Sequence, residues 1–142
     1  MIRTIDTTEF PRLIEIWESA VLATHDFLKP ADFEYYKENL PTYFSFVQLW
    51  GYEYEGKLVG FMGIASTSLE MLFIDAAVRG KGIGKALIQY GIEKQNITEV
   101  EVNEQNQQAV GFYNHLGFEI VSRSEVDGQG KPYPVLQLHL VQ

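Results

Sequence analysis

Apolar residues recur at helical spacing near the N-terminus of the chain. After a short expected strand at residues 3–5, Thr7 or Thr8 is expected to cap a helix. The apolar positions of this helix share one face and are Phe10, Leu13, Ile14, Trp17 and Val21. A second helix is expected from Pro30 to about Tyr43, bent or ended near Pro41, because proline cannot continue the helical hydrogen bonds.

The middle of the chain changes to shorter apolar runs that are typical of strands. Residues 47–54 and 58–65 flank the turn Glu55-Gly56-Lys57, and together they predict a hairpin. The second run is apolar almost throughout, as expected of a strand covered on both faces. A further strand is expected at residues 70–75.

The remaining pattern alternates helices and strands. It predicts a helix ending near Lys94, a strand at 98–102, a helix from Asn106 to Gly117, and a final hairpin of 118–126 and 135–140. From this pattern alone, residues 1–142 are expected to form one domain of the α/β or α+β class.

Composition narrows the function classes. The chain has no cysteine, and it carries a formal net charge of -8, which argues against general binding of nucleic acid. We find neither the apolar core of a signal peptide nor an apolar run long enough to span a membrane, so a cytoplasmic protein is expected. The acidic balance suits a cationic or amine substrate.

A glycine-rich segment departs from this acidic background. Arg79-Gly80-Lys81-Gly82-Ile83-Gly84-Lys85 lies between the strand at 70–75 and the next expected helix. Glycines let the backbone approach a ligand closely, and the helix N-terminus and three cations favour an anion. The segment therefore predicts a phosphate-binding loop, with a solvated basic turn as the alternative. It does not end in Gly-Lys-Ser or Gly-Lys-Thr, and it lies too late in the chain for a dinucleotide fingerprint.

The spacing Arg-x-x-Gly-x-Gly, at positions 79, 82 and 84, resembles the pyrophosphate loop of the GNAT superfamily, the acyl-CoA-dependent N-acetyltransferases. The segment 103–118 resembles the family's later cofactor-and-acid segment, with an Asn, an Ala, Phe-Tyr and Gly-Phe in the same order. Residues 23–28 and 130–134 are similar to a bacterial branch, the YjaB-like acetyltransferases. The resemblance covers nearly the whole chain.

The resemblance implies the GNAT fold, an α/β (α+β) architecture in which a mixed, strongly twisted sheet of about seven strands has about four helices on its two faces. It implies acetyl-CoA as co-substrate, with its pyrophosphate on residues 79–85. Backbone groups of Leu72, Phe73 and Ile74 are expected to pair with the pantetheine arm. Asn106 is expected to bind the same arm or to cap its helix, and Asn103 is the other possibility.

The implied reaction is attack of a neutral amine on a thioester, which needs a base for the amine and an acid for the leaving sulfur. Tyr113 matches the family's acid, and core packing is the alternative. Glu70, at the start of its strand, and His25, next to Asp26, are rival candidates for the base. Three scattered histidines predict no metal site.

The leading hypothesis is therefore an N-acetyltransferase that brings acetyl-CoA and the primary amine of a small molecule or peptide together in a ternary complex. A CoA-binding sensor with weak catalysis is the alternative, and a structural domain is a third interpretation. Neither nucleic acid nor a membrane is an expected partner, and the chain is a monomer or a homodimer. Aromatic residues expected near the acceptor groove are Tyr35, Tyr36, Tyr43, Phe44, Phe46, Trp50 and Tyr133.

Overall fold

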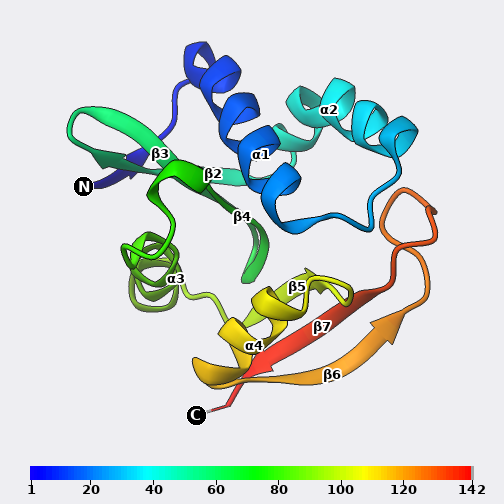
Figure 1. The fold of residues 1–142 in the computed structure, drawn as a ribbon. Coiled ribbons are helices and arrows are strands. Elements are labelled where there is room, and N and C mark those ends of the chain that lie inside the picture. Colours follow the sequence, from blue (N-terminus) through cyan, green and yellow to red (C-terminus); the bar gives the residue numbers. More distant parts are fainter. Residues whose placement is uncertain (142) are drawn as a thin grey trace.

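Seven strands form one mixed sheet in the order β1-β2-β3-β4-β5-β7-β6 (Figure 1). The computed structural model describes residues 1–141. The strands are β1 (Ile2–Thr4), β2 (Gln48–Tyr54), β3 (Lys57–Ala65), β4 (Ser68–Ile74), β5 (Glu99–Asn103), β6 (Phe118–Ser124) and β7 (Val135–Leu140). The pair β4 and β5 is parallel, and the other neighbours are antiparallel. The predicted sheet and its fold class are confirmed.

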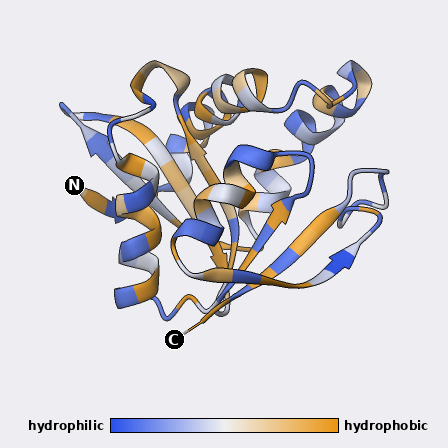
Figure 2. Ribbon diagram, turned by 60° about the horizontal axis from the view of Figure 1, so that its bottom comes forward, coloured by the Kyte–Doolittle hydropathy of each residue, from blue (hydrophilic) through white to orange (hydrophobic). Residues whose placement is uncertain are grey.

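Four α-helices cover the two faces of the sheet. They are α1 (Phe10–Thr24), α2 (Pro30–Phe44), α3 (Ile83–Lys94) and α4 (Gln107–His115), with short 3-10 helices at Thr7–Glu9 (η1) and Ala76–Val78 (η2). Figure 2 shows helix ribbons that change between hydrophobic and hydrophilic segments, as expected of helices with one face on a sheet. Across residues 1–141, every helix falls short of the length and hydrophobicity needed to cross a bilayer.

Helices α1 and α2 share one hydrophobic core with the N-terminal half of the sheet. Leu13 and Ile16 of α1 are fully buried there, together with Phe61 of β3. Phe44, at the end of α2, packs edge-on against Phe61 with ring centroids 5.7 Å apart. This packing fixes the two helices over β3 and β4, where the acceptor groove is expected.

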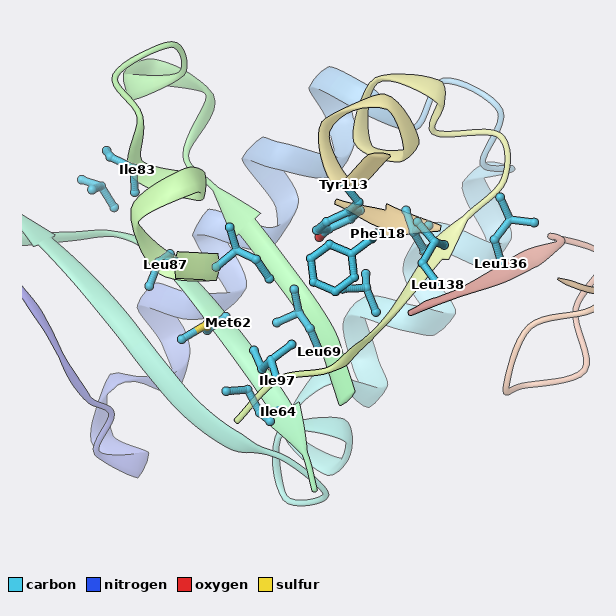
Figure 3. Packing of buried hydrophobic residues seen from close by; sticks show 14 residues of the cluster. Met62, Ile64, Leu69, Ile83, Leu87, Ile97, Tyr113, Phe118, Leu136 and Leu138 are labelled. Atoms are coloured by element: carbon cyan, nitrogen blue, oxygen red, sulfur yellow. The ribbon is translucent and has the colours of Figure 1, made fainter. Parts of the chain in front are cut away.

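Helices α3 and α4 pack on the other face. Leu87 of α3 and Met62 of β3 are fully buried in this second core, and Tyr113 of α4 lies beside Phe118 (Figure 3). The loop with the three glycines leads directly into α3. The core therefore holds both the start of α3 and the tyrosine of α4 against the middle of the sheet.

The cap of the first helical turn differs from the one predicted, whereas α2 spans nearly the predicted range and does not end at Pro41. The cap at the first helical turn is Asp6, because its carboxylate accepts from Thr8 N–H and the Glu9 carboxylate accepts from Asp6 N–H, which completes a capping box. Helix α2 continues past Pro41 to Phe44. Burial of Leu40 and Phe44 on either side of Pro41 holds this last turn in place.

Gly91→Ala is expected to lower the free energy of unfolding by about 1–3 kcal/mol, because a Cβ there overpacks the core. The added carbon would lie only 2.3 Å from Cδ1 of the buried Ile97. Gly111→Ala is the matched control, since nothing lies within 4 Å of a Cβ at that helical position. It should stabilise the protein by about 0.5–1 kcal/mol, and urea denaturation of both variants checks the contrast.

Candidate active site

The sheet opens between β4 and β5. These parallel strands pair at Ser68↔Glu99 and at the following position on each strand. Beyond that point β4 remains paired with β3, and β5 remains paired with β7. We call the point of separation the fork; past it the two halves of the sheet diverge (Figure 1).

A cavity of about 570 Å³ occupies the opening past the fork. Its lining includes Arg79 and Gly84 of the glycine loop, Tyr113 on α4, and Glu70 at the fork. A smaller cavity of about 170 Å³ adjoins it under α1 and α2, and both are lined by Glu70 and His25. The structure thus brings the predicted phosphate loop, the predicted acid and both candidate bases to one continuous space.

The free edge of β4 faces this space with only some of its backbone groups. Asp75 N–H donates to Val59 O on β3 at 2.8 Å. Since the polar groups of successive residues in an antiparallel strand point to opposite sides, those of Ile74 and Leu72 point toward β5. Those of Phe73 point toward β3. Of the strand segment predicted to bind pantetheine, Leu72 and Ile74 therefore have the suitable orientation.

The glycine loop presents unbonded N–H groups to the same space. Gly80 and Gly82 have φ angles of 81° and 78°, in the region that favours glycine, and Gly82 is the N-cap of α3. The N–H of Ala86 donates to Gly82 O. The N–H groups of Ile83 and Gly84 precede this bond and so have no acceptor within the helix. They form an N-terminal anion site of the kind that binds phosphate.

The three cations of the loop are exposed. Arg79 donates to the Gln108 side chain of α4 at 2.7 Å, and Lys81 Nζ lies 5.7 Å from the centroid of the Tyr54 ring. Within residues 1–141, neither of these cations nor Lys85 forms an ion pair with a carboxylate. Their charges remain available to an anion at the start of α3.

Tyr113 is 5% exposed and reaches the large cavity from α4. Its ring packs edge-on against Phe118 with centroids 6.1 Å apart, and Figure 3 shows the two side by side. Burial raises the pKa of the Tyr113 hydroxyl above its usual value. The phenol therefore keeps its proton at neutral pH, and the same burial makes it a weaker acid than a tyrosine in water.

The two candidate asparagines have different roles. Asn106 Oδ1 accepts from Ala109 N–H at 3.2 Å and caps α4, so its helix-capping role is present. Asn103 lines both cavities, and its Oδ1 is buried without a hydrogen-bond partner among the described residues. A buried acceptor without a partner is unfavourable, which indicates a ligand donor at this position.

Glu70 lies at the fork, on a bulge of β4. Gly63 pairs with Met71 while the next residue of β3 pairs with Leu69, which leaves Glu70 as an additional residue. Its carboxylate accepts from Ser68 Oγ at 3.2 Å. Burial and then a hydrogen bond with the neighbouring Glu101 raise the pKa of Glu70 to about 8. A carboxyl with this pKa exchanges its proton near neutral pH.

His25 follows α1 and is also part of both cavities. Burial lowers its pKa to about 4, against an opposing effect of Asp26. The Thr24 hydroxyl donates to Ala20 O and lies 2.7 Å from His25 Nδ1, so Nδ1 carries the hydrogen of that contact. A neutral imidazole of such low pKa holds a proton weakly. No group of His, Asp and Glu side chains within residues 1–141 is arranged to bind a metal ion.

The loop between β6 and β7 closes the smaller cavity, a contact that sequence reasoning missed. Figure 1 shows this loop beside the connection from α1 to α2. Tyr133 donates to Asp32 of α2, and Tyr36 of α2 donates to Asp127 of the loop. Lys131 Nζ adds an ion pair with Asp32 at 3.1 Å. The aromatic residues in 35–43 and Tyr133 were expected in this region from the sequence. Their partners were not predicted, because Tyr133 and Asp32 are 101 positions apart along the chain.

Glu101 is a second residue that sequence reasoning missed. It lies on β5 directly after the fork, lines the large cavity and accepts from Gln137 Nε2 of β7 at 3.3 Å. The alternation in residues 98–102 places Glu99 and Glu101 on one face of the strand. The alternation alone does not predict that Glu101 lies beside Glu70, because β4 and β5 are distant in the sequence and their pairing is not encoded in either segment.

Comparisons with known proteins agree with this geometry. Residues 21–133 match the family described as "Acetyltransferase (GNAT) domain". The chain is 44% identical over 131 residues to the peptidyl-lysine N-acetyltransferase YjaB of Salmonella typhimurium, covering 92% of this chain and 90% of the relative. It is 32% identical over 147 residues to the peptidyl-lysine N-acetyltransferase YiaC of Escherichia coli, covering 100% and 99%.

Solved structures give the same result. The solution structure of apo YjaB from Escherichia coli superposes with a TM-score of 0.85 at 40% identity, covering 99% of this chain and 97% of that one. The PaiA N-acetyltransferase of Thermoplasma acidophilum, solved with coenzyme A, shares the fold with a TM-score of 0.73 at 22% identity, covering 98% of each chain. The chain therefore belongs to the GNAT family, as its two motifs predicted, and is an N-acetyltransferase.

Proposed function

We propose that this enzyme transfers the acetyl group of acetyl-CoA to the ε-amino group of lysine side chains in proteins. The relatives YjaB and YiaC are named peptidyl-lysine N-acetyltransferases, and the PaiA relative was solved with coenzyme A. The main support for this proposal is the cavity of about 570 Å³, which extends from the glycine loop to Glu70. It gives one continuous site to a phosphate-bearing donor and a cationic acceptor.

The residues around this cavity fit coenzyme A. N–H groups from Gly80 to Lys85 bind the pyrophosphate, with Arg79 and Lys81 adding charge. The outward backbone groups of Leu72 and Ile74 bind the pantetheine amides as an added strand. The unpartnered Asn103 Oδ1 accepts an amide N–H, and the NH₂ of Asn106 is the remaining donor on that wall. When bound, acetyl-CoA supplies an acetyl group activated as a thioester.

The reaction is direct transfer within a ternary complex. The sequence has no cysteine to carry the acetyl group as a thioester. Glu70 accepts a proton from the acceptor ammonium, because its pKa of about 8 suits neutral pH better than the pKa of about 4 of His25. Tyr113 donates its phenolic proton to the departing sulfur. His25 remains neutral and shapes the wall between the two cavities.

We further propose that residues 1–142 act as one catalytic domain in the cytoplasm, where acetyl-CoA and lysine-containing proteins occur together. Support for a single domain comes from the shared sheet, since β4 and β5 each provide residues for donor and acceptor.

A peptide with one internal lysine and a blocked N-terminus tests the function. Incubation with acetyl-CoA should add one acetyl group to this lysine, as read by mass spectrometry. A matched peptide with arginine at that position should remain unmodified. Acetylation of a free α-amino group, with none on the lysine side chain, would contradict the proposed acceptor.

Gly84→Val is expected to weaken CoA binding at least about tenfold, a loss of about 1.4 kcal/mol. A Cβ at Gly84 would lie 3.8 Å from Ile74 Cγ1, so the helix accepts it, while the valine methyl groups extend into the cavity. Calorimetric titration with CoA measures the effect. Gln89→Val, on the exposed side of α3, is the control. Unchanged CoA affinity in folded Gly84→Val would place the phosphate site elsewhere.

A further inference from the structure

We propose that Glu70 and Glu101 hold one proton between them, and that binding of a cationic acceptor amine expels this proton to solvent through Glu101. The expulsion leaves Glu70 as a carboxylate that then takes a proton from the amine. This inference rests on the proposed function, because it assumes that the acceptor arrives as an ammonium ion.

The geometry of the fork brings the two side chains together. Ser68↔Glu99 and the next pair are the positions where β4 and β5 are hydrogen-bonded, so Glu70 and Glu101 follow on adjacent strands. Both carboxyls line the large cavity. The bulge at Glu70 changes the direction of its side chain relative to the regular strand. Two carboxyls thus meet where the acceptor and donor spaces join.

Neither carboxyl has a cationic partner. Within residues 1–141, no Lys, Arg or His lies within ion-pair distance of Glu70 or Glu101. Within residues 1–141 the side chains that donate hydrogen bonds to them are neutral: Ser68 Oγ donates to Glu70, and Gln137 Nε2 donates to Glu101. Two close carboxylates without a cation repel each other, and sharing one proton removes that repulsion.

Besides the pair, the ionisable groups that line the large cavity are His25, Tyr43, Tyr113 and Arg79, and Arg79 lies at its other end, in the glycine loop. On β5, Glu99 contacts His139 of β7 at 3.7 Å. On the side of α1, His25 is held neutral by burial. Around the smaller cavity the remaining ionisable groups are Asp127 of the β6–β7 loop, Tyr36 and Tyr43 of α2, and Tyr133. The raised pKa of Glu70, to about 8, agrees with a proton held in this acidic surrounding.

An ammonium group beside Glu70 and Glu101 changes the preferred protonation state of the two carboxyls. Its positive charge favours the doubly ionised pair, so the bound proton leaves for solvent. The ammonium then transfers one proton to the Glu70 carboxylate and becomes a neutral amine. The amine nitrogen bonds to the acetyl carbon, the carbon–sulfur bond breaks, and the sulfur leaves with a proton from Tyr113. The amide nitrogen loses its extra proton, which restores Tyr113, and the proton on Glu70 restores the pair.

Glu101 provides the route outward. Glu101 is exposed to solvent, whereas Glu70 is partly buried. Gln137, which donates to Glu101, accepts from Ser122 Oγ of β6 at 2.7 Å, so the polar contacts continue across the open face of β7 and β6. Glu101 is therefore a positioning residue that sets the proton affinity of Glu70 and connects it to water.

Calorimetric titration of the CoA complex with the blocked lysine peptide tests the proposal. With CoA in place of acetyl-CoA no transfer occurs, and binding heats in buffers of different ionisation enthalpy give the number of protons released. The wild-type enzyme should release about one proton per bound peptide at neutral pH. Glu101→Gln should release less than about half of that, because Glu70 alone binds its proton more weakly.

Glu99→Gln is the matched control, since Glu99 lies on the same face of β5 but contacts His139. It should release protons as the wild type does. Equal release by the wild type and Glu101→Gln would overturn the role of Glu101. Absence of release by the wild type, for a peptide that is acetylated when acetyl-CoA is present, would overturn the shared proton and leave the proposed function intact.

The pH profile gives a second readout that a merely structural role of Glu101 would not change. In Glu101→Gln the acidic limb of kcat/KM should move to lower pH by about 1 unit, since a like charge no longer raises the pKa of Glu70. Glu99→Gln should move it less. An acidic limb that stays in place in Glu101→Gln, in an enzyme that remains active, would contradict the proposal.

Discussion

Glu70→Gln is expected to lower kcat/KM for a lysine peptide by about 10²–10⁴-fold at neutral pH, the usual contribution of a general base. Glutamine keeps the length of the side chain and its place at the fork, but it cannot take a proton from the ammonium group. CoA affinity should stay near the wild-type value, because the glycine loop, the proposed phosphate site, lies beyond the other end of β4. Steady-state kinetics and calorimetric titration with CoA measure the two quantities.

The same substitution should stabilise the fold at alkaline pH. The pKa of Glu70 is raised from 4.5 to about 8 in the folded protein. The folded state therefore binds this proton more tightly than the unfolded state. Its contribution to stability is complete below pH 4.5 and is lost as the pH rises through 8. Glu70→Gln removes that loss, so its melting temperature should exceed that of the wild type above pH 8.

His25→Gln is the comparison that separates the rival bases. If His25 were the base, His25→Gln would lower kcat/KM by about the 10²–10⁴-fold expected for loss of a general base, and Glu70→Gln would retain most of the activity. Such a result would contradict the assignment of Glu70. The low pKa of His25 leads us to expect the smaller effect from His25→Gln, expressed in KM more than in kcat.

The parts of the fold and site that the sequence predicted are those encoded locally. The residues 79–85 combine a turn, a helix start and three cations within one short segment, so their order alone indicates an anion site. Tyr113 was singled out as a candidate acid because it stands in a second motif that follows the first at a fixed place in the family, and the structure places it in the lining of the large cavity. Capping at Asp6 was missed because several neighbouring polar residues could serve as the cap.

The parts that the sequence did not predict depend on contacts between distant segments. The fork exists because β5 leaves β4 after two paired positions, and no single segment encodes that separation. The roles proposed for Glu101 and for Asn103 Oδ1, which has no hydrogen-bond partner within residues 1–141, depend on this geometry. The contacts of α2 with the β6–β7 loop are equally non-local, because each joins a tyrosine to a carboxylate far along the chain.

Tyr113→Phe is expected to lower kcat by about 10²-fold, the lower part of the range for a general acid, because water can replace the phenol in part. The variant keeps the ring that packs against Phe118 and removes only the hydroxyl. CoA affinity should change little, since the lost interaction belongs to the transition state. Single-turnover measurements with the lysine peptide, next to calorimetry with CoA, separate chemistry from binding.

Tyr90→Phe is the matched control, because Tyr90 packs against Trp50 with ring centroids 5.3 Å apart on α3 and does not line either cavity. It should leave kcat unchanged. The raised pKa of Tyr113 also means that its ionisation cannot limit the wild-type rate in the moderately alkaline range. A wild-type kcat that is steady there, and a Tyr113→Phe variant with full single-turnover rate, would together show that Tyr113 serves only in packing and that the sulfur leaves with a proton from water.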